Sequence, residues 1–260
     1  MKYLIVGRSC VGKSTLAQKL EIAGLKTVKS YTTRPKRDDK DNDHIFITPE
    51  EAKSFTDRVA STTINGYDYF ATREQVKNSD IYVIDPIGVY KICEHMPDTE
   101  FALIYITAKP ETSRTFALNR TENTTDNENK DTVYDARRKD EDAEFTDFEQ
   151  KLADNKNLPD NIAMTYQFEN QFTQECITGY AAAILNQHAK HKHMEQLIKE
   201  MIDAGRMRID NDGNILCKIE DDDGNPVDSK VDVEHFATLI LGSDSNFHVF
   251  MNEWLELYKI

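Results

Sequence analysis

The chain begins with an apolar run, MKYLIV, followed by two glycines that lie five residues apart. The stretch GRSCVGKS fits the pattern G-x-x-x-x-G-K-[S/T], in which backbone N–H groups of a tight turn and of the next helix converge on a polyphosphate. Glycines are expected there because side chains would hinder the approach of a phosphate to the backbone. Lys13 is expected to reach the β- and γ-phosphates, and the Ser14 hydroxyl to ligate Mg²⁺.

The pattern therefore predicts a strand, a phosphate-binding turn and a helix that together hold ATP. The residues expected to bind it are Gly7, Arg8, Ser9, Cys10, Val11, Gly12, Lys13, Ser14 and Thr15. A glycine-rich turn without a ligand is the alternative. Cys10 stands at a variable position of the pattern, where a passive thiol or a redox sensor would fit.

The composition limits the class of protein and its partners. A net charge of −14 over 260 residues argues against an extended nucleic-acid surface, because phosphate backbones need clustered cations. No apolar run approaches the roughly 20 residues of a membrane span. The four cysteines are scattered singly, which is typical of reduced thiols in a cytoplasmic protein. We therefore expect a cytoplasmic protein that binds neither nucleic acid nor a membrane.

Apolar strands alternate with helical patterns over the first 189 residues. Strands are predicted at residues 2–7, 44–48, 81–85, 102–107 and 164–170, and a hairpin around Asn65-Gly66. Helices are predicted at 13–24, 87–95, 132–153 and 171–189, and a mobile polar loop at 121–131. This alternation indicates an α/β fold with a parallel sheet.

The character of the chain changes after HAKHKH (188–193), so a soft domain boundary is placed near residue 190. The three histidines are interpreted as a solvated junction rather than as a metal site. Beyond it we expect a helix at 194–204, a hairpin around Asp212-Gly213, a solvated acidic loop at 220–228, and one or two helices in 231–260. This small α+β extension has no predicted role, although a homodimer through it is one possibility.

A second motif, SYTTRPKR, offers a site for another anion. Ser30, Arg34 and Arg37 place a hydroxyl and two guanidinium groups within eight residues. Arginine forks suit a phosphate dianion because they can bind it through two parallel hydrogen bonds. A solvated basic loop is the alternative.

From this point the sequence resembles the guanylate kinase family. The family carries a Ser-x-Thr-Thr-Arg-x-x-Arg segment about twenty residues after the loop lysine, and further similar segments follow in the same order. These segments are DNDHIF, NGYDYFAT, VIDPIGV, ALIYITAKPETSRTFALNR and YQFEN. The resemblance covers residues 1–189 and implies a P-loop three-layer sandwich, with a nucleoside-monophosphate-binding hairpin lobe at about 30–80 and a lid at about 114–150. It also implies ATP- and Mg²⁺-dependent phosphorylation of a nucleoside monophosphate to the diphosphate.

Position by position, the resemblance implies further roles. The acceptor phosphate would be held by Ser30, Arg34, Arg37 and Tyr69. Asp85 would lie near the acceptor nucleoside and the metal, although a carboxylate that caps the next helix is the alternative. Charge on the transferred phosphoryl group would be neutralised from the lid by Arg120 and by one of Arg137 and Arg138. The sequence leaves the choice within that pair open.

Three positions depart from the family pattern. His44 replaces a tyrosine and can still donate to a phosphate. Ala60 replaces the glutamate that reads guanine, and Ala71 the neighbouring hydroxyl residue, with Thr72 beside it. An unpaired guanine edge would cost about 1–3 kcal/mol per group.

Three readings of the function therefore stay open. In the first, GMP or dGMP is the acceptor, and a slipped hairpin brings Asp57, Thr62 or Thr63 to the base. In the second, the acceptor is another nucleotide or a sugar phosphate. In the third, the chain is a catalytically silent binding module. Lys13 and Ser14 argue against this third reading, because such modules typically lack a working phosphate loop.

Overall fold

The computed structural model describes residues 1–36, 39, 41–64, 66–119, 130–154, 157–205, 207–211, 215–220 and 226–230. The chain divides into two compact units, Met1–Leu185 and Asn186–Ile260. The division falls inside α7 (Gln174–Asp203), a single helix. This division lies close to the boundary expected near residue 190. The two helices expected on either side of HAKHKH, however, form one helix. The reason is physical: HAKHKH contains neither glycine nor proline, and its alanine and lysines favour a continuous helix.

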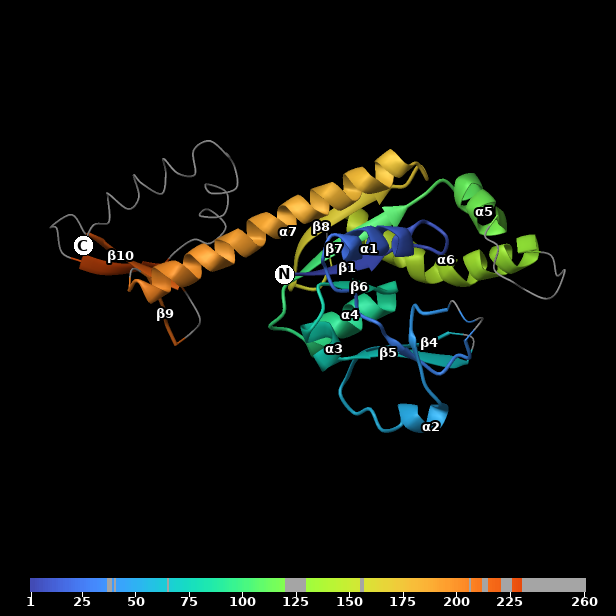
Figure 1. Cartoon of the computed structure of the whole chain (residues 1–260), viewed down its shortest axis with the longest axis horizontal. Helices are drawn as coiled ribbons and strands as arrows, with labels where there is room; N and C mark the ends of the chain where they lie inside the picture. Colours follow the sequence, from blue (N-terminus) through green and yellow to red (C-terminus); the bar gives the residue numbers. More distant parts are fainter. Residues whose placement is uncertain are drawn as a thin grey trace. The chain divides into compact units, whose positions relative to one another are not determined.

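A parallel four-stranded sheet forms the centre of the first unit (Figure 1). Its strands are β1 (Lys2–Val6), β6 (Ile81–Val83), β7 (Phe101–Thr107) and β8 (Ile162–Glu169), in the order β6-β1-β7-β8. Each pair of neighbours is parallel. The connection that leaves β1 leads to one side of the sheet and the connection that leaves β7 leads to the other. Ligand sites of such sheets lie where the connections diverge, at the carboxyl ends of the strands.

Helices cover both faces of this sheet, which confirms the predicted α/β class. One face is covered by α1 (Lys13–Ile22) and by the first part of α7. Tyr3 and Ile5 of β1 point to that side and pack with Leu16, Leu20 and other apolar residues. Gly24, predicted as the stop of the first helix, has φ 100°.

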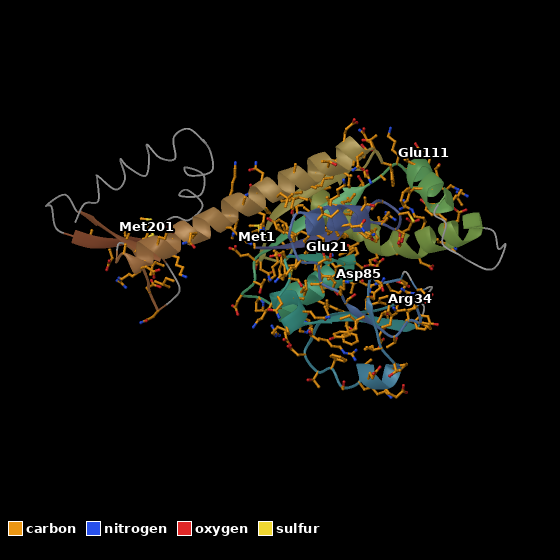
Figure 2. The ribbon with its side chains drawn as sticks, viewed as in Figure 1. Met1, Glu21, Arg34, Asp85, Glu111 and Met201 are labelled. Carbon is orange, nitrogen blue, oxygen red and sulfur yellow. The ribbon has the colours of Figure 1, made fainter. Side chains whose placement is uncertain are left out.

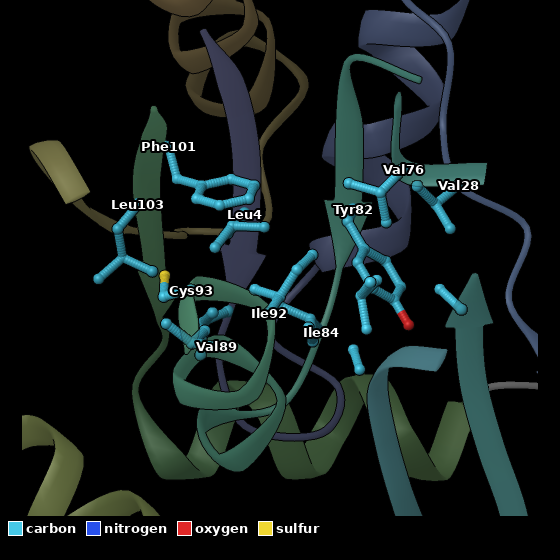
Figure 3. Packing of buried hydrophobic residues seen from close by; sticks show 14 of the residues in the cluster. Leu4, Val28, Val76, Tyr82, Ile84, Val89, Ile92, Cys93, Phe101 and Leu103 are labelled. Carbon is cyan, nitrogen blue, oxygen red and sulfur yellow. The ribbon is translucent and has the colours of Figure 1, made fainter. Parts of the chain in front are cut away.

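The other face is covered by α4 (Pro86–His95) and α6 (Lys130–Asp154). Leu4 and Leu103 of the sheet pack there against Val89, Ile92 and Cys93 of α4 (Figure 3). The second half of α6 is part of the same core. Its buried side chains are Phe145, Phe148 and Leu152. The segment expected to form the lid therefore ends inside the core.

A second, smaller sheet lies between α1 and β6 along the chain. Its strands are β2 (Tyr31–Thr32), β3 (Ile45–Phe46), β4 (Arg58–Ile64) and β5 (Tyr67–Thr72), in the order β3-β2-β5-β4. The short helices α2 (Pro49–Ala52) and α3 (Arg73–Lys77) both begin with a capping box. The hairpin predicted around Asn65-Gly66 joins β4 to β5, and Gly66 has φ 78°. We call this region, residues 30–80, the acceptor lobe, after the role that the sequence resemblance leads us to expect for it.

The remaining elements are α5 (Pro110–Asn119) in the first unit and a three-stranded antiparallel sheet in the second. The sheet contains β9 (Met207–Ile209), β10 (Ile215–Glu220) and β11 (Pro226–Lys230), in the order β11-β10-β9. The hairpin of β9 and β10 was predicted. The end of the expected acidic loop belongs instead to β11, which begins with a proline, as edge strands tolerate. The helices and the dimer contact expected in 231–260 lie outside the described residues. Within the described ranges, no helix is both long and apolar enough to cross a membrane.

Candidate functional site

The phosphate loop, residues 7–14, connects the carboxyl end of β1 to α1. Cys10 has φ 62° and Gly12 has φ 100°, so the backbone turns sharply before the helix begins. Gly12 is the N-cap of α1, and no side chain among the described residues caps it by a hydrogen bond. The first N–H groups of α1 therefore remain available to a ligand that carries negative charge.

The two loop glycines are required by neighbouring parts of the fold. A Cβ at Gly7 would lie 2.3 Å from the carbonyl oxygen of Ile106 on β7. A Cβ at Gly12 would lie 2.3 Å from Nδ2 of Asn170, and the positive φ disfavours any side chain there. The sequence pattern attributed the glycines to the approach of a phosphate. The structure adds a second reason, the close packing of the loop against β7 and the end of β8.

Lys13 lies across its own loop. Its Nζ donates to the carbonyl oxygens of Gly7, at 2.6 Å, and Arg8, at 2.8 Å. Ser14 and Thr15 lie in the first turn of α1 with exposed side chains. The lysine is thus bound to the first two residues of the loop. The Ser14 hydroxyl, at the start of α1, is accessible to an ion or a phosphate.

Asn170 fixes the loop from the end of β8. Its buried amide donates to the carbonyl oxygen of Val11 at 2.8 Å, and its Oδ1 accepts from the backbone N–H of Phe172 at 2.8 Å. We did not assign this residue to the site from the sequence. The available signal was its position at the end of the strand predicted at 164–170, where side chains of a parallel sheet reach the ligand edge.

Carboxylates of α6 meet the loop from the opposite side. Both carboxylate oxygens of Glu141 accept from the backbone N–H of Ser9 at 3.1 Å, and the Ser9 hydroxyl also donates to Glu141. Arg8 binds Glu149 through two hydrogen bonds of 3.2 and 3.3 Å, and Asp142 through one of 2.5 Å. Burial lowers the pKa of Arg8, but the carboxylates of Glu149 and Asp142 raise it above its ordinary value. None of these acids was identified from the sequence.

A cavity of about 150 Å³ lies between the loop, the end of β7 and α6. Its lining residues are Arg8, Val11, Tyr105, Ile106, Thr107, Ala108, Arg138 and Glu149. Nη1 of Arg138 is buried and has no hydrogen-bond partner in the described part of the chain. The other lid arginines cannot be compared with it, because Arg120 and the side chain of Arg137 lie outside the described residues.

Asp85 follows β6 at the same edge of the sheet (Figure 2). Its Oδ1 accepts from the N–H of Gly88 at 2.6 Å, so it caps α4, as the alternative interpretation predicted. Burial raises the pKa of its carboxyl group, and the positive charges of Lys91 and Lys13 act in the opposite direction. Among the described residues, no three metal-binding side chains of the His, Cys, Asp or Glu type gather at one point.

The acceptor lobe brings four of the predicted substrate residues together, which we call the acceptor cluster: Ser30, Arg34, His44 and Tyr69. Ser30 Oγ and His44 Nδ1 form a hydrogen bond of 2.9 Å, and the rings of His44 and Tyr69 lie 5.4 Å apart. Tyr69 also forms a hydrogen bond with Arg34. Arg37 lies outside the described residues.

Arg34 is paired with a carboxylate that the sequence motifs did not identify. Nη1 of Arg34 lies 2.9 Å from Asp41, and the two side chains are only 12% and 7% exposed. Nε of Arg34 is buried and has no hydrogen-bond partner among the described residues. The guanidinium group therefore keeps an unused buried donor beside an ion pair, which is an arrangement that a further anion could complete.

Ala60 and Ala71 do not line an open pocket. They are cross-strand partners of β4 and β5, are 3% and 0% exposed, and belong to the apolar cluster shown in Figure 3. Two of the residues proposed to replace the missing glutamate have other partners. Asp57 forms an ion pair of 3.2 Å with Arg73, and Thr63 donates to Asp68 at 3.2 Å.

No protein-family model matches the chain, and no curated protein matches it. Among solved structures, the guanylate kinase from Anaplasma phagocytophilum is similar over 72% of this chain and 82% of that chain, with 20% sequence identity and a TM-score of 0.44.

Proposed function

We propose that this chain is a phosphotransferase that uses ATP and Mg²⁺ to convert a nucleoside monophosphate to the diphosphate, as the guanylate kinases do. The triphosphate would bind in the phosphate loop, and the acceptor phosphate would bind at the acceptor cluster. Phosphoryl transfer requires mainly alignment of the two phosphates and neutralisation of charge, and it needs no covalent nucleophile.

One observation carries this proposal: Ser9 N–H and the Ser9 hydroxyl already bind a carboxylate at the mouth of the loop. Two donors of Ser9 therefore converge on one negatively charged group. Lys13 and the uncapped start of α1 lie next to this position. A triphosphate offers oxygens of the same kind and more charge, so it fits the donors that the carboxylate uses.

The residues present also fit a magnesium ion that arrives with the nucleotide. Mg²⁺ is commonly held by one or two protein oxygens together with phosphate oxygens and water. The Ser14 hydroxyl and the Asp85 carboxylate could supply those protein oxygens. When bound, the ion would neutralise part of the charge on the phosphates. Arg138, whose Nη1 lacks a described partner, would add positive charge beside the cavity.

The acceptor is proposed to be a monophosphate because Arg34 keeps a buried Nε, without a partner in the described part of the chain, near Ser30, His44 and Tyr69. GMP or dGMP is the leading candidate. A second candidate, a non-guanine nucleotide or a sugar phosphate, is favoured by Ala60 and Ala71. Both are buried in apolar surroundings and offer no hydrogen bond to a base edge.

The test is ADP release, measured by a coupled assay against a panel of nucleoside and sugar monophosphates. We expect turnover with at least one acceptor. Lys13→Ala should lower kcat/KM on the order of 10²–10³-fold, since it removes a charged donor to the transferred group. Lys19→Ala, six residues further along the same helix, is the matched control and should leave activity unchanged. Arg34→Ala should raise KM for the acceptor.

Two results would contradict the proposal. Absence of turnover with every acceptor, together with measured ATP binding, would indicate a binding module instead. Full activity of both Lys13→Ala and Arg34→Ala would show that neither site takes part in phosphate transfer. A response to phosphorylated sugars alone would select the second candidate.

A further inference from the structure

We infer that Glu141 is an internal competitor of the triphosphate: its carboxylate occupies the donors of Ser9 in the ligand-free protein and must leave before a nucleotide can bind. This inference rests on the proposed function, because it concerns the same loop. It goes further by naming a residue that sets the affinity of the loop for its ligand.

The contact between Ser9 and Glu141 has the geometry of an anion-binding site in which the glutamate carboxylate is the bound anion. Both oxygens of Glu141 lie 3.1 Å from the Ser9 nitrogen, and the Ser9 hydroxyl donates to one of them. Ser9 itself is buried, so these donors have little access to water. A ligand oxygen and the glutamate oxygens therefore cannot use the same N–H at the same time.

Neighbouring contacts hold the glutamate in this position. Asp142 and Glu149 both bind Arg8, the loop residue next to Ser9. The Arg8 guanidinium also lies 5.1 Å from the ring centre of Phe145, between those two acids on α6. Residues three, four, seven or eight positions apart lie along one stripe of a helix. Glu141 and Asp142 are each spaced in this way from Phe145 and Glu149, so the four residues form one broad face toward the loop.

The carboxylates on this face of α6 disfavour nucleotide binding as long as Glu141 stays bound to Ser9. Three carboxylates lie next to the loop, and a triphosphate would add several negative charges at short range. Displacing Glu141 from Ser9 frees the donors and moves one of the charges away. The end of α6 is buried in the core through Phe148 and Leu152. We therefore expect the movement that releases Glu141 from Ser9 to occur in the part of α6 that carries Glu141.

A competitor within the chain lowers affinity by the fraction of molecules in which the site is open. We expect Glu141 to be bound to Ser9 in about nine tenths of the ligand-free molecules, which corresponds to about a tenfold loss of affinity. Glu141→Gln keeps the size of the side chain and one acceptor oxygen but removes the charge. It should therefore bind the triphosphate about tenfold more tightly, a difference of about 1.4 kcal/mol.

The experiment is calorimetric titration of the full chain with ATP and with inorganic tripolyphosphate, each in the presence of Mg²⁺. The parent is compared with Glu141→Gln and with Asp140→Asn, which removes one charge from an exposed position next to Glu141. We expect Glu141→Gln to tighten both ligands about tenfold and Asp140→Asn to change them less than twofold. The melting temperature of ligand-free Glu141→Gln should fall by about 2–4 °C, because a contact that holds the empty protein is weakened.

Equal affinities of the parent and Glu141→Gln would overturn the inference and leave the proposed function intact. Weaker binding by Glu141→Gln would also overturn it, since the carboxylate would then assist the ligand or its metal. Turnover is not the readout, so a chain that binds the triphosphate but transfers nothing would still decide the question. If no variant binds either ligand, both the inference and the proposed function fail.

Discussion

The phosphate loop and the acceptor lobe both bring positive or positively polarised groups together, but they use different parts of the chain. In each, a carboxylate of the chain lies against positive or positively polarised groups, Glu141 at the loop and Asp41 at Arg34. The loop uses mainly backbone N–H groups, fixed by the glycines and Asn170 and supported by the central sheet. The lobe uses side chains on a sheet that includes two-residue strands.

The difference shows which kind of site can be recognised from spacing. A backbone site needs glycines and a lysine at fixed intervals, so its pattern is readable in one short stretch. A side-chain site depends on segments that meet only in the folded chain. The lobe joins Ser30 and Arg34 to Asp41, His44 and Tyr69, and the surrounding sheet decides which of them become neighbours.

The largest effect is expected from Ala60→Glu, which restores the carboxylate that the resemblance leads one to expect. Ala60 is almost fully buried among apolar side chains, so the new group would be an unpaired buried charge. We expect the free energy of unfolding to fall by about 4 kcal/mol or more, measured by urea denaturation.

The matched control for this substitution is Ile64→Glu. Ile64 lies on the same strand, four residues further along, but is 44% exposed. It should cost less than about 1 kcal/mol. The expectation fails if Ala60→Glu folds as well as the control and gains activity with GMP. That result would mean that the lobe opens at Ala60 and that its side chains can bind a base there.

Asp41→Asn should have the next largest effect, because it leaves the Arg34 guanidinium buried without its carboxylate. Removal of one partner of a buried ion pair costs about 3 kcal/mol. Since the variant keeps the Arg34 cation without its carboxylate, added inorganic phosphate should restore more stability to it than to the parent. Thermal unfolding with and without phosphate measures both effects.

Asp135→Asn is the control for that prediction. It breaks the pair of Arg114 and Asp135, whose side chains are 42% and 56% exposed. Exposed pairs contribute roughly 0–1 kcal/mol. Similar losses of stability in the two variants would mean that the pair of Arg34 and Asp41 contributes no more than an exposed pair. Asp41 would then not resemble Glu141 in occupying a site for an anion.

The sequence predicted the fold class, the strands of the central sheet and the loop, because each depends on local periodicity or spacing. It did not predict β2, α2 or α3, which are short and stabilised by caps and tertiary contacts. It also missed Asp41, Glu141 and Asn170. Their importance arises from pairings across the fold, such as that of Asn170 with Val11, and nothing in their immediate neighbourhood marks those pairings.

Asn170→Ala tests whether the loop depends on its support from β8. The change leaves the Val11 carbonyl without its buried donor, so it should cost about 2 kcal/mol in stability and raise KM for ATP several-fold. Asn161→Ala is a close control at the other end of β8, since the Asn161 amide donates to carbonyls of Cys93, Met96 and Thr99. It should cost similar stability but leave KM for ATP unchanged. A similar rise of KM for ATP in both variants would mean that the loss of overall stability, and not the contact of Asn170 with the loop, lowers the affinity for ATP.

The smallest effect concerns pH and the contact of α6 with the start of α4. Glu144 accepts from the N–H of Ile87 at 3.1 Å, and burial raises the pKa of its carboxyl group, with the negative charges of Asp85 and Glu141 adding to the rise. A carboxyl group whose pKa is raised on folding binds its proton more tightly in the folded chain. Its contribution to stability is therefore greatest below the ordinary value of 4.5 and is lost as the pH rises through the raised value. Glu144→Gln can keep the hydrogen bond but does not titrate, so its stability relative to the parent should increase between about pH 4 and pH 8, as measured by urea denaturation at several pH values. Asp140→Asn, at an exposed position of the same helix, should stay within about 0.5 kcal/mol of the parent at every pH. A constant difference between Glu144→Gln and the parent would mean that Glu144 is solvated in solution and that α6 leaves the start of α4.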